Sequence, residues 1–144
     1  MKLEWLILAD WAQVIGNKLY VQGGGWDVLT VNTGFPMNQQ IGLAASFVVP
    51  WEATNQRHTV EIEIATDDGA SLAKIGGQFE VGRPAGIKPG QNQRFQLAAN
   101  AGLQLQREGT YAIIARVEDQ EVGRTHFNVM PGPFSGMRSQ EGAA

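Results

Sequence analysis

The chain has 144 residues, a formal net charge of −3, no cysteine and a hydrophobic fraction of 43%. This length corresponds to one domain of the usual ~100–200 residues, and the hydrophobic fraction indicates a globular rather than a disordered chain. The absence of cysteine excludes disulfides, thiolate metal sites and cysteine nucleophiles. The net negative charge is unlike that of nucleic-acid-binding proteins, which carry clustered lysine and arginine. No apolar run approaches the ~18–20 residues of a membrane span.

The first ten residues predict a β-strand rather than an export signal. A secretory signal needs an apolar stretch of ~7–15 residues and a small-residue cleavage site. Here Glu4 interrupts the apolar run and Asp10 ends it. We therefore expect the domain to begin at Met1 and the protein to be cytoplasmic.

Several segments alternate apolar and polar residues with a period of two, which is typical of half-exposed β-strands. Val60, Ile62 and Ile64, for example, alternate with Glu61 and Glu63, so one face is apolar and the other is charged. In contrast, 111–117 is apolar on both faces and predicts a central strand. In chain order, the expected strands span 3–8, 12–15, 19–22, 59–66, 71–81, 94–99, 103–106, 111–117 and 122–129.

Turn residues separate these segments. Asp67, Asp68 and Gly69 lie between two expected strands, which indicates a hairpin. Prolines in 32–36 and 83–90 disfavour a continuous strand, so both segments are expected to be loops. No segment holds a capped helical period over more than about ten residues, so strands dominate.

The spacing of turns, near ten residues, predicts an all-β protein, specifically an immunoglobulin-like antiparallel β-sandwich of about eight to nine strands over residues 1–130. Gly109 followed by Tyr111 at the start of a strand suggests a corner at which the tyrosine hydroxyl bonds backbone across the turn. Residues 131–144 contain three glycines and two prolines without periodicity, and are expected to form a flexible C-terminal tail.

Five stretches together carry a resemblance to a known family; they span 4–10, 23–27, 49–51, 71–81 and 109–111. On these residues the chain resembles a family of small bacterial proteins, found in actinobacteria and related groups, that is classed only as a domain of unknown function. The resemblance covers about residues 1–130 and implies an intracellular, stand-alone β-sandwich. It implies no activity and no catalytic residues.

Residues that could bind a metal, act in catalysis or hold a phosphate are each explained as well by a structural role. His58 and His126 lack metal-ligand spacing and are expected at the surface or rim. Glu61 and Glu63 share a strand face about 7 Å apart, a spacing compatible with an acid–base pair but also with a solvated face. The three glycines at 23–25 lack a phosphate-binding pattern and are expected to mark a bend where the chain crosses between sheets.

The tryptophans are the strongest binding candidates. Trp5 alternates with Leu3 and Ile7 and is expected in the core, whereas Trp11, Trp26 and Trp51 fall at strand edges or turns. Large rigid rings at such positions can stack on sugars or anchor a protein interface, and packing in the core or at its rim explains them as well. The predicted partner- or ligand-binding residues are Trp11, Trp26, Asp27 and Trp51.

These features favour a non-catalytic β-sandwich that acts as a binding or assembly module, with a protein partner or self-association as its mode of action. The charged fraction of 17%, against a typical ~25%, favours a surface that is easily desolvated, although glutamine and asparagine also account for it. The alternative is a domain that binds a small ligand or carbohydrate through exposed tryptophan side chains. We expect no enzymatic activity, no cofactor, no metal site and no nucleic-acid partner.

Overall fold

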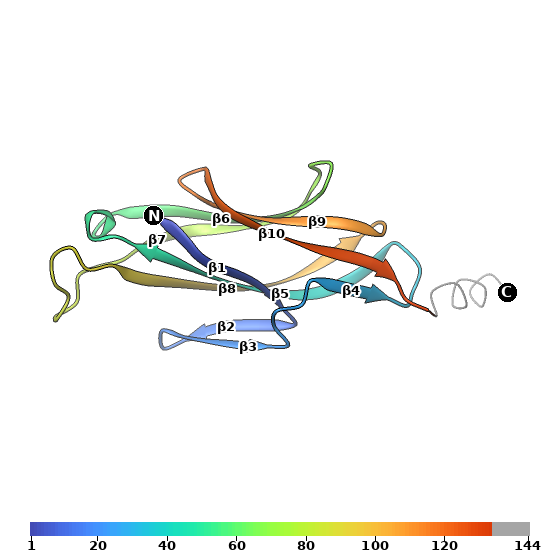
Figure 1. Cartoon of the computed structure of the whole chain (residues 1–144), viewed down its shortest axis with the longest axis horizontal. Coiled ribbons are helices and arrows are strands. Elements are labelled where there is room, and N and C mark those ends of the chain that lie inside the picture. Colours follow the sequence, from blue (N-terminus) through green and yellow to red (C-terminus); the bar gives the residue numbers. More distant parts are fainter. Residues whose placement is uncertain (134–144) are drawn as a thin grey trace.

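The structure is a computed structural model, and it describes residues 1–133. Within this range the chain forms strands, which Figure 1 labels, and one short turn of 3-10 helix. The strands are β1 (Lys2–Ala9), β2 (Trp11–Ile15), β3 (Lys18–Gln22), β4 (Val28–Val31), β5 (Met37–Val49), β6 (Arg57–Thr66), β7 (Ser71–Glu80), β8 (Gln93–Leu105), β9 (Gly109–Val117) and β10 (Gln120–Pro131), and the 3-10 turn η1 spans Trp51–Ala53. The prediction of an all-β fold is confirmed.

The expected strands are present, with bounds shifted by at most two residues, except at β8. There, 94–99 and 103–106 belong to one continuous strand, because all thirteen residues of β8 pair with β5. Two strands were not predicted. β4 has four residues, which carry too little alternation, and β5 is buried on both faces over most of its length, so it shows no alternation of apolar and polar residues there. The predicted tail, 131–144, falls outside the described residues from 134 onward.

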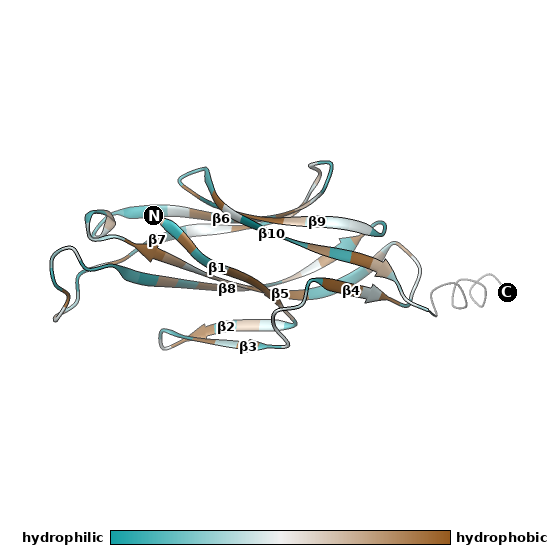
Figure 2. Ribbon diagram, viewed as in Figure 1, coloured by the Kyte–Doolittle hydropathy of each residue, from teal (hydrophilic) through white to brown (hydrophobic). Residues whose placement is uncertain are grey.

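The strands form three sheets. Their orders are β1-β5-β8, β4-β10-β9-β6-β7 and β2-β3. The expectation of antiparallel pairing is wrong at one place, because β4 runs parallel to β10. In Figure 2 the loop that joins β9 to β10 is hydrophilic, whereas β1 and β4 carry hydrophobic residues.

The core lies between the three-stranded and the five-stranded sheet. Alternate residues of β5, among them Leu43 and Phe47, are buried in one cluster with alternate residues of β9, such as Ile113 and Ala115. Burying one such large side chain stabilises the fold by roughly 1.5–3 kcal/mol. β9 lies between β10 and β6, which confirms the prediction of a central strand at 111–117.

The predicted tyrosine bond is present at the corner before β9. The Tyr111 hydroxyl donates to the backbone oxygen of Arg107 over 2.6 Å. Its ring is buried and stacks on Phe127 with a centroid distance of 5.3 Å. One side chain thus joins the loop, β9 and β10.

The expectation that Trp5 lies in the core is wrong. An irregularity between Leu3 and Trp5 shifts the register of β1, so that Trp5 lies opposite Ser46. Directly opposed residues share a face, and the neighbours of Ser46 in β5 are core residues. Trp5 is therefore on the outer face, where Ser46 also donates a hydrogen bond to Glu4.

Candidate interaction surface

The hairpin β2–β3 forms a third layer on the outer face of the three-stranded sheet (Figure 1). Gly16 and Asn17 join its strands, with φ angles of 56° and 63°. Two successive residues with positive φ form the turn whose twist matches that of paired strands. The turn fixes the pairing of Ile15 with Lys18, and the rest of the register follows without a bulge.

Asn100 of β8 holds the hairpin against the sheet. The Ala12 amide donates to Asn100 Oδ1 at 3.0 Å, and Asn100 Nδ2 donates to the Ala12 oxygen at 2.7 Å. Beside this contact, a Cβ added to Gly42 would lie 2.9 Å from the backbone of Trp11. A glycine in β5 and an asparagine in β8 therefore allow β2 to lie directly on the sheet.

The hairpin carries an unusual number of exposed apolar side chains. Trp11, Ile15 and Tyr20 are 44%, 56% and 50% exposed, respectively, and Val14 is 37% exposed. Strand alternation and pairing place Trp11, Ile15 and Tyr20 on the face directed away from the sheet. We call these three residues the hairpin face.

The two edges of the hairpin differ. Ala12 bonds Asn100, so its backbone groups point away from β3, and antiparallel alternation directs those of Leu19 and Val21 away from β2. β3 pairs only with β2. The edge of β2 is thus capped at Ala12, whereas the edge of β3 presents the backbone donors and acceptors of Leu19 and Val21 without a strand partner.

The four predicted site residues lie in different places. Trp11 belongs to the hairpin face. Trp26 is half-buried against the core, edge-on to Phe127 at 5.9 Å. Asp27 precedes β4, where its backbone oxygen accepts from the amide of Asn128. Within residues 1–133, no hydrogen bond or ring contact joins these residues to Trp51, which begins η1.

The ring of Trp51 is stacked against Arg83 of the same chain. The guanidinium of Arg83 lies 3.6 Å from the centre of its ring. Arg83 also donates to Thr54 Oγ1 at 2.6 Å and to the Trp51 oxygen at 3.1 Å. Such a stacked arginine covers one face of the indole, so Trp51 ties the loop after β7 to η1.

The glycines at 23–25 lie where the chain leaves the hairpin for the five-stranded sheet, as the sequence suggested. Gly25 donates its amide to the Leu8 oxygen over 2.8 Å. A Cβ on Gly23 would lie 2.2 Å from the carboxylate of Asp10. The carboxylate of Asp10 is therefore beside the end of β3.

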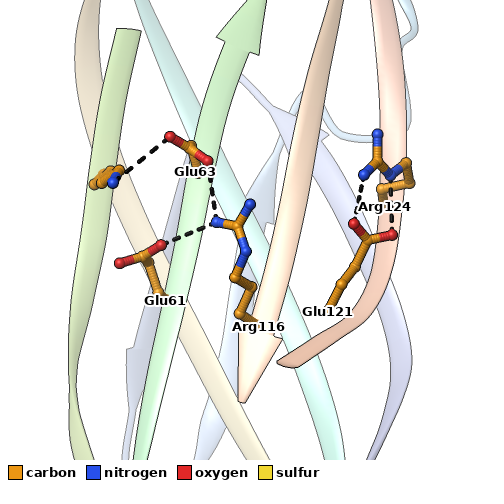
Figure 3. Close-up of polar contacts among 6 residues, drawn as sticks. Glu61, Glu63, Arg116, Glu121 and Arg124 are labelled. Carbon is orange, nitrogen blue, oxygen red and sulfur yellow. Dashed lines mark hydrogen bonds and ion pairs between the residues drawn. The ribbon is translucent and has the colours of Figure 1, made fainter. Parts of the chain in front are cut away.

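Figure 3 shows the charged groups on the outer face of the five-stranded sheet. Arg116 Nη1 donates to Glu61 Oε1 and Glu63 Oε1, each over 3.0 Å, and Lys74 lies 3.9 Å from Glu63. On β10, Arg124 forms a separate pair with Glu121. A hydrogen bond from Ser71, together with Arg116 and Lys74, lowers the pKa of Glu63 below its ordinary value. Glu63 is therefore ionised at neutral pH and unsuited to be a general acid.

The two histidines differ. His126 is exposed on β10, as expected, but His58 is buried, which corrects the expectation of a surface or rim position. His58 Nδ1 lies 2.7 Å from Glu118 Oε1, and Nε2 lies 2.7 Å from the Ala53 oxygen. Both neighbours are acceptors, so both hydrogen bonds form when the ring carries two protons. The hydrogen bond with His58 lowers the pKa of Glu118.

The outer face of the five-stranded sheet carries surface pockets. One of about 310 Å³ lies on the outer face of the five-stranded sheet. Its lining combines apolar residues, such as Ala112 and Ile114, with residues of both charges, among them Glu63, Arg116 and Arg124. None of the four predicted site residues lines it.

Two kinds of feature are absent from residues 1–133. No group of three or more histidine, aspartate or glutamate side chains is placed to hold a metal ion. Likewise, this part of the chain contains no helix with the length and apolar character needed to cross a membrane.

Three residues of this surface were not predicted from the sequence: Ile15, Tyr20 and Asn100. The available signal was the Gly16–Asn17 turn, which fixes which residues of the hairpin share a face. Nothing in the sequence indicated that β2 would lie on β8, because Ala12 and Asn100 are 88 positions apart.

Comparisons with known proteins add a family but no activity. A family model described as a family of unknown function, DUF6941, matches residues 4–130. No curated protein matches the chain. Among solved structures, the chain is similar to the Pseudomonas fluorescens alkylpurine DNA glycosylase AlkC bound to DNA containing an abasic site analog, with 14% sequence identity and a TM-score of 0.34. That similarity covers 72% of the chain and 28% of the glycosylase.

Proposed function

We propose that the chain, which belongs to DUF6941, a family of unknown function, is a non-catalytic module that binds protein through hairpin β2–β3. One observation carries this proposal. Of the six exposed large hydrophobic residues in the described chain, four lie on this hairpin. Single exposed hydrophobic residues are ordinary, but their concentration in one place is typical of interaction sites.

The chemistry of the hairpin suits a protein partner. Tryptophan and tyrosine bury large areas with little loss of side-chain freedom and are enriched at interfaces. Gln13 and Gln22 flank the aromatic residues on the same face, and Lys18 is its one charged residue. Little charge has to be desolvated when this surface is covered.

The carboxylates support a non-catalytic reading. Glu61 and Glu63 were the candidates for an acid–base pair, and both accept from Arg116. Glu63, whose pKa is lowered from 4.5, is ionised at neutral pH and holds no proton that a general acid would donate. Their arrangement therefore favours cross-strand ion pairing on the sheet.

An immunoglobulin-like architecture is part of the proposal. Two observations support it. In the five-stranded sheet the last strand, β10, lies between β9 and the parallel strand β4, and the Tyr111 hydroxyl bonds the Arg107 oxygen. In this reading β2–β3 is an insertion between the first strand and β4. A cytoplasmic location is also proposed; the lack of cysteine suits a reducing compartment, and cell fractionation tests it.

Site-specific photo-crosslinking tests the binding surface. A photoreactive phenylalanine analogue replaces Tyr20 in one variant and Met130, which is also 50% exposed, in a control. In cells that naturally express the chain, we expect a discrete crosslinked protein only from position 20. Its yield should fall when Trp11→Ser and Ile15→Ser are added. Equal crosslinking from positions 20 and 130, or none from position 20, would contradict the proposal.

A further inference from the structure

We propose that the protein bound by the hairpin is a second copy of this chain, and that the two β3 strands pair antiparallel across a two-fold axis at Tyr20. This inference rests on the proposed function and specifies its partner. The result is one four-stranded sheet, in the order β2-β3-β3-β2, that joins two molecules.

The edge of β3 has the hydrogen-bonding pattern that such pairing requires. The groups that point outward belong to Leu19 and Val21, which lie symmetrically on either side of Tyr20. With the axis at Tyr20, Leu19 faces Val21 of the partner subunit, and each such pair exchanges two hydrogen bonds. An isologous contact uses the same patch on both molecules, and this edge is complementary to itself.

The charges at the ends of β3 are also complementary. Lys18 would lie opposite Gln22 of the partner subunit, so no like charges face each other. Next to Gln22 in each chain is Gly23, against which the Asp10 carboxylate lies. Neither Lys18 nor Asp10 forms an ion pair within the described chain. The pairing brings Lys18 near Asp10 of the partner subunit at both ends of the contact. Opposite charges on neighbouring strands stabilise a sheet, whereas like charges destabilise it.

The strand is suited to pairing and has few of the features that protect sheet edges. Protective features include short strands, proline, bulges and charged residues, above all lysine. β3 contains no proline, its pairing with β2 has no bulge, and its one charge is at its first residue. The opposite edge of the hairpin is capped at Ala12 by Asn100, which leaves β3 as the strand available to a partner.

A cysteine at position 20 tests the axis directly, because the natural chain has no cysteine. Tyr20 and Tyr20 of the partner subunit would form a non-hydrogen-bonded pair with Cα atoms about 4.5 Å apart, within the ~4.4–6.8 Å range of disulfides. We expect Tyr20→Cys to form a covalent dimer under mild oxidation. Val28→Cys, at a position 45% exposed on the edge strand β4, is the matched control and should give only background.

A second cysteine tests the register. Two copies of Lys18→Cys would be separated by four residues along the strands, roughly 13 Å at ~3.3 Å per residue, and should not crosslink. Mixing Lys18→Cys with Gln22→Cys should give a heterodimer. If Lys18→Cys alone crosslinks as well as Tyr20→Cys, the proposed register is wrong.

Light scattering over a concentration series tests association without crosslinks. We expect the wild-type mass to rise from 15.6 kDa toward twice that value. Leu19→Pro removes an edge donor that the hairpin itself does not use, a substitution tolerated at sheet edges, and should remain monomeric. Lys18→Glu should weaken association at least several-fold, and the double variant Lys18→Glu with Asp10→Lys should restore it.

The outcomes separate this inference from the proposed function. A wild-type monomer at all concentrations, together with no disulfide above the Val28→Cys control, would overturn the second-copy proposal. If position 20 nevertheless crosslinks a different protein in cells, the hairpin is a binding surface and only the identity of the partner is wrong. Failure of rescue by the double variant would overturn the proposed Lys18–Asp10 contact.

Discussion

The side chain of Asn100 bonds both backbone groups of Ala12, as a neighbouring strand would, with its Oδ1 accepting at 3.0 Å and its Nδ2 donating at 2.7 Å. A single amide thereby satisfies the edge of β2 where the hairpin lies on the sheet. Both groups are partly buried, so their loss would leave polar atoms without partners.

Replacing Asn100 should therefore loosen the hairpin. We expect Asn100→Ala to lower the free energy of unfolding by roughly 1–3 kcal/mol, the cost of leaving partly buried backbone groups unsatisfied. Urea unfolding measures this change, and amide exchange at Ala12 should accelerate. Gln104→Ala, at an exposed position of the same strand, is the control, and equal effects of the two substitutions would argue against the role of Asn100.

Gly42 is required for the close approach of β2. Its Cβ would meet the Trp11 backbone at 2.9 Å, and backbone cannot move aside as a flexible side chain can. We expect Gly42→Ala to cost about 1–3 kcal/mol, as overpacking does, and to change the fluorescence of Trp11. Gly77→Ala, where a Cβ meets nothing within 4 Å, should leave the stability almost unchanged. A neutral Gly42→Ala variant would show that the hairpin is not in close contact.

The corner before β9 is stabilised by the Tyr111 hydroxyl. Tyr111→Phe keeps the ring in the core but removes its bond to the Arg107 oxygen. The free energy of unfolding should fall by about 0.5–1.5 kcal/mol. Tyr20→Phe removes the same atom from an exposed ring and should have little effect on the stability of the monomer, measured by denaturation at low concentration.

Acid should destabilise the fold partly through Glu63. Its pKa is lowered from the ordinary 4.5, first by the Ser71 hydrogen bond and also by Arg116 and Lys74. A lowered pKa means that the ionised group stabilises the folded state above pH 4.5, and that this contribution is lost as the pH falls through the folded-state pKa. Between about pH 6 and pH 3, the stability of Glu63→Gln should therefore fall less steeply than that of the wild type.

Denaturation at a series of pH values measures this slope. Glu80→Gln is the control, since Glu80 is exposed and forms no ion pair in the described chain. If Glu63→Gln and the wild type lose stability in parallel, the ion-pair network does not respond to acid as described.

Local patterns in the sequence were sufficient for most of the strands. The alternation around Ile62 and the apolar run at 111–117 predicted an amphipathic and a central strand, because side-chain direction alternates with a period of two in any strand. The corner at Tyr111 was also predictable, since its hydroxyl bonds a backbone group only four residues away. Such features depend on neighbours in the sequence.

Tertiary structure decided the features that depend on distant residues. Trp5 faces outward because a bulge against β5 shifts its register, and Trp51 is covered because Arg83, 32 residues later, stacks on it. The candidate binding surface exists because Asn100 and Gly42 receive the hairpin from strands remote in sequence. The sequence by itself thus determined most of the strands and their turns. Packing between strands decided which aromatic rings are covered and which edge stays open, because exposure is a property of contacts and not of residue type.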